Sequence, residues 1–96
     1  MTSKQRAYLK GLASNLTPVF QIGKASLTPE VVIAVDEALE KRELIKLSVL
    51  KNCFEDTNGL ADTLAERTHS QVVQVIGKKI ILYRPAKKNS KIQLPQ

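Results

Sequence analysis

One lysine in a short polar loop is the residue of this sequence best placed to meet a charged ligand. Lys24 belongs to the segment Gly23–Ser26, which follows a short apolar run, and Thr28 and Pro29 then begin a helix. A loop that leads into a helix presents free backbone amides and a partial positive charge, which together can hold a phosphate. Glu30, in the first helical turn, would repel a phosphate on the helix axis. We therefore expect the loop backbone and Lys24 to make the contact.

The other reactive side chains are too few for an active site. His69 is the only histidine and Cys53 the only cysteine, and we interpret them as a residue at a helix end and a small buried residue. Metal ligands are scarce, the carboxylates between positions 36 and 43 have the spacing of a solvated helix face, and the GxxxxGK[ST] pattern of nucleotide-binding loops is missing. We expect no enzyme, no cofactor and no small-molecule substrate, and a catalyst that uses Cys53 is a disfavoured alternative.

The distribution of charge favours a polyanionic partner. The net charge is +6, and all nine acidic residues fall between Glu30 and Glu66, so that both ends of the chain are purely cationic. The aromatic residues are two phenylalanines and two tyrosines, too few for a stacking surface, and we expect Phe20 and Phe54 to fill the core. The unpaired cysteine and the lack of a signal peptide or a membrane span predict a cytoplasmic protein without a membrane partner. We expect it to be a monomer.

The hydrophobic periodicity predicts how this loop is positioned. The expected elements, in order, are a helix over 3–15, a strand over 18–22, a helix over 29–42, a strand over 44–50, a helix over 58–68, and strands over 71–76 and 79–84. The last two strands form a hairpin and the earlier crossovers imply parallel neighbours. This predicts an α/β fold of the α+β type with a mixed four-stranded sheet. Residues 1–86 form one domain, and residues 87–96 form a flexible basic tail.

Several separated motifs resemble a known family. The segments that carry the resemblance include Gln21-Ile22-Gly23-Lys24, Arg42-Glu43-Leu44-Ile45-Lys46, Val73-Gln74-Val75-Ile76-Gly77 and Leu82-Tyr83-Arg84. Over about residues 2–86 the chain is similar to the single-domain bacterial YhbY proteins, which are stand-alone members of the CRM (chloroplast RNA splicing and ribosome maturation) domain family.

The resemblance implies an RNA-binding fold like the C-terminal domain of translation initiation factor three, related to KH-like folds. It also implies association with the precursor of the large ribosomal subunit, through a GxxG loop that approaches the RNA backbone. Here Gly23-Lys24-Ala25-Ser26 occupies the place of that loop, with Ser26 instead of the second glycine. A serine resists positive φ because it has a Cβ, although its hydroxyl can donate to a phosphate.

We therefore expect a non-enzymatic protein that binds ribosomal RNA during assembly of the large subunit. The expected RNA-binding residues are Gly23, Lys24, Ala25 and Ser26 of the loop, Lys4, Arg6 and Lys10 of the first helix, and Lys46, Lys78, Lys79 and Arg84. The alternative is a protein-binding assembly module that contacts mainly ribosomal proteins, through the region of Ile33 or a sheet edge.

Overall fold

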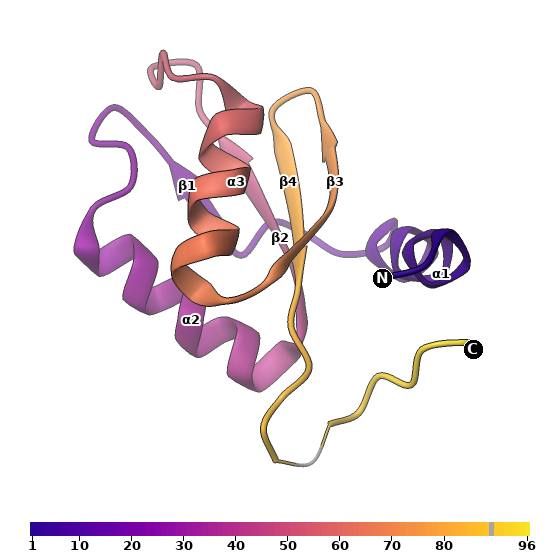
Figure 1. Cartoon of the computed structure of the whole chain (residues 1–96). Coiled ribbons are helices and arrows are strands. Elements are labelled where there is room, and N and C mark those ends of the chain that lie inside the picture. Colours follow the sequence, from indigo (N-terminus) through magenta and orange to yellow (C-terminus); the bar gives the residue numbers. More distant parts are fainter. Residues whose placement is uncertain (89) are drawn as a thin grey trace.

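The order of helices and strands agrees with the sequence prediction. The computed structural model describes residues 1–88 and 90–96. In this part of the chain the elements are α1 (Ser3–Ala13), β1 (Phe20–Ile22), α2 (Pro29–Arg42), β2 (Leu44–Val49), α3 (Thr57–Thr68), β3 (Gln71–Ile76) and β4 (Lys79–Tyr83) (Figure 1). None of these helices has the length and apolar composition needed to cross a bilayer.

The strands form the predicted mixed sheet, in the order β1-β2-β4-β3. β1 runs parallel to β2, whereas β4 is antiparallel to both β2 and β3. Parallel strands end at the same side of a sheet, and the pairing of Ser48 with Lys79 brings the β3–β4 turn to that side as well. We call this side the loop end of the sheet, and it carries the loops after β1, after β2 and between β3 and β4.

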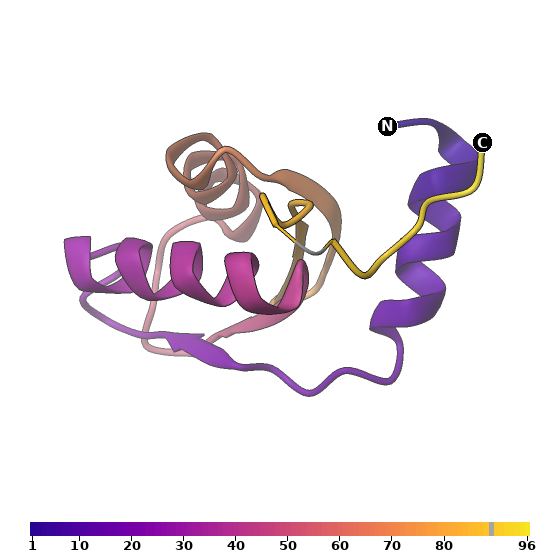
Figure 2. The ribbon, with the colours of Figure 1, turned by 90° about the horizontal axis from the view of Figure 1, so that it is seen from below.

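Helices cover both faces of the sheet. α2 and α3 pack on one face, where the main core includes Val35 and Leu39 of α2, Leu64 of α3 and Leu47 of β2. α1 packs on the other face, and its Leu9 and Ala13 join a smaller cluster with residues of β2, β3 and β4 (Figure 2).

The ends of several elements depend on capping side chains. Thr28 caps α2 as predicted, because its hydroxyl accepts a hydrogen bond from the amide of Val31. Thr2, the residue before the predicted helix start, caps α1 and forms a capping box with Gln5. α1 also ends two residues before Asn15, and β1 begins at Phe20 rather than at residue 18.

The prediction that both phenylalanines fill the core was wrong for one of them. Phe20 packs against the main core, but Phe54 is 91% exposed. The neighbouring Cys53 takes the inward position and is buried, as predicted, so the next side chain points outward. His69 caps the C-terminus of α3, also as predicted, with a left-handed φ of 55°.

Residues near the C-terminus make contacts that composition alone did not indicate. Residues 87–96 contain few apolar side chains, yet Ile92 and Leu94 pack against the smaller cluster that includes Leu9 and Ala13 of α1. The chain end lies beside α1 (Figure 2). The buried carboxylate of Glu43, at the end of α2, accepts four hydrogen bonds from the residues that follow β4. The donors are the amides of Ala86, Lys91 and Ile92 and the hydroxyl of Ser90.

Candidate nucleic-acid interface

The loop after β1 is a tight turn whose tip faces solvent. The amide of Ser26 donates to the carbonyl of Gly23 at 2.9 Å, which leaves Lys24 and Ala25, both exposed, at the centre of the turn. Within residues 1–88 and 90–96, the amides of Lys24 and Ala25 have no hydrogen-bond acceptor, and Lys24 forms no ion pair. Two free amides beside a free ammonium can hold a phosphate.

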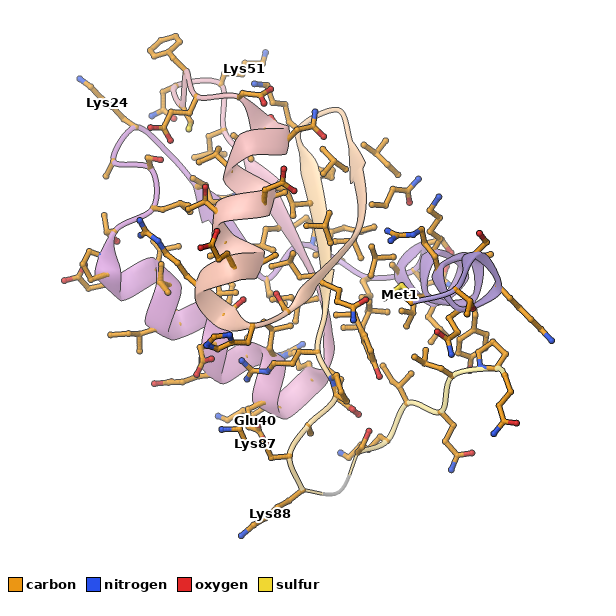
Figure 3. All side chains as sticks on the ribbon, viewed as in Figure 1. Met1, Lys24, Glu40, Lys51, Lys87 and Lys88 are labelled. Carbon is orange, nitrogen blue, oxygen red and sulfur yellow. The ribbon has the colours of Figure 1, made fainter. Side chains whose placement is uncertain are left out.

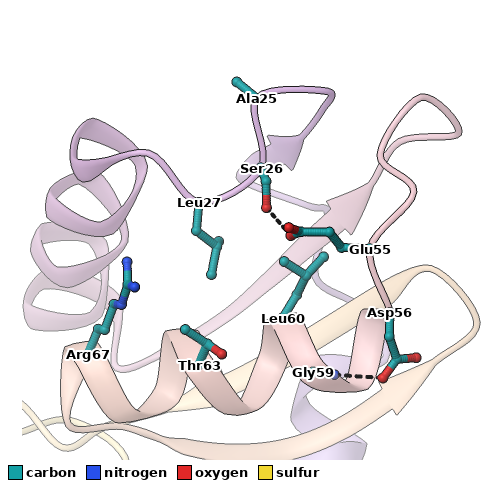
Figure 4. Close-up of a pocket in the computed structure, with 9 residues that line it drawn as sticks. All are labelled: Ala25, Ser26, Leu27, Glu55, Asp56, Gly59, Leu60, Thr63 and Arg67. Carbon is teal, nitrogen blue, oxygen red and sulfur yellow. Dashed lines mark hydrogen bonds between the residues drawn. The ribbon is translucent and has the colours of Figure 1, made fainter.

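Ser26 adopts the conformation that a glycine would accept more easily. Its φ is 59°, in the left-handed region, where a Cβ costs about 1 kcal/mol. Its hydroxyl donates to the carboxylate of Glu55 in the loop after β2 (Figure 4). The expectation that this hydroxyl is available to a phosphate is therefore not met, because the carboxylate already occupies it.

Two substitutions at Ser26 separate the backbone strain from the hydrogen bond. Ser26→Ala and Ser26→Gly both remove the hydroxyl, but only glycine relieves the left-handed strain. We expect Ser26→Gly to be more stable than Ser26→Ala by about 1 kcal/mol in urea unfolding. Equal stability of the two variants would mean that the loop in solution does not hold this residue at positive φ.

A hollow of about 540 Å³ lies between this loop and α3, and its charge makes it a poor phosphate site. Ala25, Ser26 and Leu27 line one side, and Leu60 and Thr63 of α3 line the other (Figure 4). The lining residues also include the acidic Glu55 and Asp56 and the basic Arg67. Because two carboxylates lie here, a polyanion should meet the outer side of the loop, where Lys24 points.

Four lysines lie at the loop end of the sheet, and we call them the lysine cluster: Lys24, Lys51, Lys78 and Lys79. Lys24 follows β1, and Lys51 follows β2; both extend outward at the same end of the molecule (Figure 3). The carbonyl of Lys78 accepts from the amide of Val49 at 2.7 Å, and the ammonium of Lys79 donates to the Ser48 hydroxyl at 2.8 Å. These contacts place the β3–β4 turn beside the end of β2.

Lys51 was absent from the predicted RNA-binding residues, although the predicted parallel pairing contained the needed signal. Residues that follow two parallel neighbours emerge at the same end of the sheet, so Lys51 had to lie near Lys24 once β1 and β2 were placed side by side.

Three other predicted lysines lie outside the lysine cluster. Lys46, half-buried in the middle of β2, alternates with core residues and so faces the side of the sheet that carries α1. Lys4 and Lys10 are exposed on α1, and the ammonium of Lys4 donates to the carbonyl of Gln96 at 3.3 Å. The structure thus distributes the predicted lysines over two surfaces.

Both predicted arginines are held inside the protein. The guanidinium of Arg6 donates to the carbonyls of Val72 and Val73 at 2.7 and 2.9 Å. Arg84, with a side chain only 14% exposed, pairs with Asp36 at 2.6 Å and donates to the carbonyl of Thr68 at 2.7 Å. Each guanidinium donates to acceptors within the protein, so the expectation that these two residues belong to the RNA surface is not supported by their positions.

The described residues also contain no cluster of three or more acidic, histidine or cysteine side chains with the geometry of a metal site. Cys53 and His69 sit on opposite ends of α3, since one precedes its first residue and the other follows its last. The loop end of the sheet therefore offers a ligand mainly positive charge, with the free ammonium of Lys24 and the free amides of Lys24 and Ala25 at its centre.

Several known proteins resemble this chain along almost all of its length. Residues 1–84 match the CRS1 / YhbY (CRM) domain. The chain is 47% identical to the "Probable RNA-binding protein YqeI" of Bacillus subtilis over 95 residues, 99% of each chain. It is 38% identical to an "RNA-binding protein" of Haemophilus influenzae over 96 residues, which cover 100% of this chain and 96% of that protein. The solution structure of SAV1595 from Staphylococcus aureus superposes with a TM-score of 0.83 at 49% identity, covering 99% of each chain.

Proposed function

Because the chain belongs to the CRS1/YhbY (CRM) domain family, we propose that it binds RNA through the Gly23–Ser26 loop and the lysine cluster. The observation that carries the proposal is the position of Lys24 at one end of the sheet, among three further lysines. Lys24 is exposed, its own amide and that of Ala25 are free, and it forms no ion pair with any residue that the structure describes. Two similar proteins are named RNA-binding proteins, which favours RNA among the possible polyanions.

We further propose that the RNA is ribosomal and that the protein acts on the large-subunit precursor, as its resemblance to the YhbY proteins implies. It would work in the cytoplasm as a monomer, without a cofactor or catalytic step. The rival proposal is a module that reaches the ribosome through a ribosomal protein, and the 57% exposed Ile33 on α2 offers an apolar contact for it.

The test is filter binding of large-subunit ribosomal RNA fragments at several salt concentrations. If about four to six phosphates are contacted, the logarithm of the affinity should fall with the logarithm of salt with a slope of roughly −3 to −4 for single strands. Lys24→Ala removes one contact and should lower the affinity about fivefold at 0.1 M salt. The matched control is Lys88→Ala, an exposed lysine at the opposite end of the molecule (Figure 3).

An affinity of Lys24→Ala within about twofold of the parent would remove the loop from the interface. In cell extracts, the protein should sediment with large-subunit particles and be released by salt or ribonuclease. Association that survives both treatments, but is lost on Ile33→Asp, would favour the protein-binding rival instead.

A further inference from the structure

The loop that contains Phe54 is held against the loop that contains Lys24. A Cβ at Gly23 would lie 3.5 Å from the side-chain oxygen of Asn52, and Ser26 donates to Glu55. Gly23 and Ser26 flank Lys24, and Asn52 and Glu55 flank Phe54. The hydrogen bond between Ser26 and Glu55, together with the closeness of Gly23 to Asn52, therefore places the tips of the two loops next to each other.

The ring of Phe54 is unusually open to water. It is 91% exposed, whereas the next most exposed large apolar side chain among the described residues, Ile33, is 57% exposed. The backbone on either side of Phe54 is anchored, because Cys53 before it is buried and Asp56 after it caps α3 through the amide of Gly59. An aromatic ring that projects into water from an anchored loop is available for contact with another molecule.

We propose that Phe54 stacks on an unpaired RNA base while Lys24 and Lys51 hold the neighbouring phosphates. The inference rests on the proposed function and names the form of the RNA: a single strand, loop or bulge. A duplex buries both faces of each base in its own stack, so only an unpaired nucleotide can offer a face to the ring. Lys51 in the same loop and Lys24 in the adjoining loop complement a polyanion, which favours RNA over an apolar protein surface as the partner.

The first test compares Phe54→Ala with Phe54→Tyr on a single-stranded RNA of about 12 nucleotides and on a duplex of the same sequence. Loss of one base stack should weaken single-strand binding by about tenfold for alanine, while tyrosine, which keeps a ring, should stay close to the parent. Duplex binding should be unchanged in both variants. Because the side chain is exposed, the variants should keep the parent's thermal unfolding midpoint.

The second test uses the absence of tryptophan from the sequence. Phe54→Trp introduces a single tryptophan, and the single-stranded RNA should quench the fluorescence of this tryptophan as a base stacks on it. The matched control is Leu12→Trp, at a partly exposed position on α1, which should remain unquenched by the same RNA.

The outcomes distinguish this inference from the proposed function. Three results would each overturn the stacking role while RNA binding stands: single-strand binding of Phe54→Ala within about twofold of the parent, an equal loss on the duplex, or no quenching of the Phe54→Trp fluorophore. A parent protein that binds neither RNA would overturn the proposed function itself.

Discussion

Removal of four charges from the lysine cluster should abolish most of the affinity for single-stranded RNA. The variant combines Lys24→Gln, Lys51→Gln, Lys78→Gln and Lys79→Gln, four exposed residues at the loop end of the sheet. Each phosphate contact contributes about fivefold at 0.1 M salt, so the loss of four should weaken binding by about 10² to 10³-fold and reduce the salt slope by about 3.

The measurement is a salt titration of binding for the parent, this variant and a matched control. The control also removes four positive charges, by glutamine at Lys41, Lys87, Lys88 and Lys91, all exposed and remote from the loop end. It should keep most of the parent's affinity, since exposed charges beyond a Debye length of about 10 Å are largely screened. An equal loss in both variants would show that net charge, rather than the lysine cluster, determines binding.

The substitution Glu43→Gln should be the most destabilising single change at a charged residue. The side chain is 2% exposed, and its carboxylate accepts four hydrogen bonds from residues after β4. In glutamine, an NH2 group replaces one of the two carboxylate oxygens. This group cannot accept the two hydrogen bonds that the oxygen accepted. We expect a loss of about 2 to 4 kcal/mol in the free energy of unfolding at pH 7.

The same hydrogen bonds make the stability depend on pH. Burial raises the pKa of Glu43, but hydrogen bonds from Ser90, Ala86, Lys91 and Ile92 outweigh it and lower the pKa from 4.5 to about 2. A carboxylate with a lowered pKa contributes stability above pH 4.5, and this contribution is lost as the pH falls from 4.5 towards 2. Glu43→Gln should remove this part of the acid sensitivity.

Urea unfolding between pH 2 and 7 and amide exchange at Ile92 measure the two effects. Glu37→Gln, an exposed carboxylate on the same helix, is the matched control and should change neither. Parent-like stability of Glu43→Gln, with slow exchange at Ile92 in both proteins, would mean that the buried carboxylate does not fasten this segment. Rapid exchange at Ile92 in the parent would favour the flexible tail that composition predicted.

Local signals in the sequence were sufficient to predict the fold. Thr28 and Pro29 mark the start of α2, Gly77 marks the β-hairpin, and the apolar spacing from Leu60 to Ala65 marks the buried side of α3. These signals act within a few residues of each other. Element ends were less predictable because Thr2 and Ser3 can both cap a helix, and the choice depends on Gln5.

The candidate site was only partly predictable, because its composition depends on distant pairings. The turn at Lys24 was found from neighbouring residues, but Arg84 was assigned to the surface since its partner Asp36 lies 48 positions away. Phe54 was assigned to the core because its hydrophobicity says nothing about which of two adjacent side chains points inward. Lys51 needed the sheet pairing before its nearness to Lys24 could be seen.

Strand β3 borders the sheet, and a register irregularity between Val72 and Gln74 interrupts its pairing with β4. Bordering strands invite strands from other molecules to add to the sheet, which leads to aggregation. Arg6 occupies the carbonyls of Val72 and Val73 at this interruption. The first helix therefore occupies two carbonyls of an edge strand and hinders strand addition there between copies of the protein.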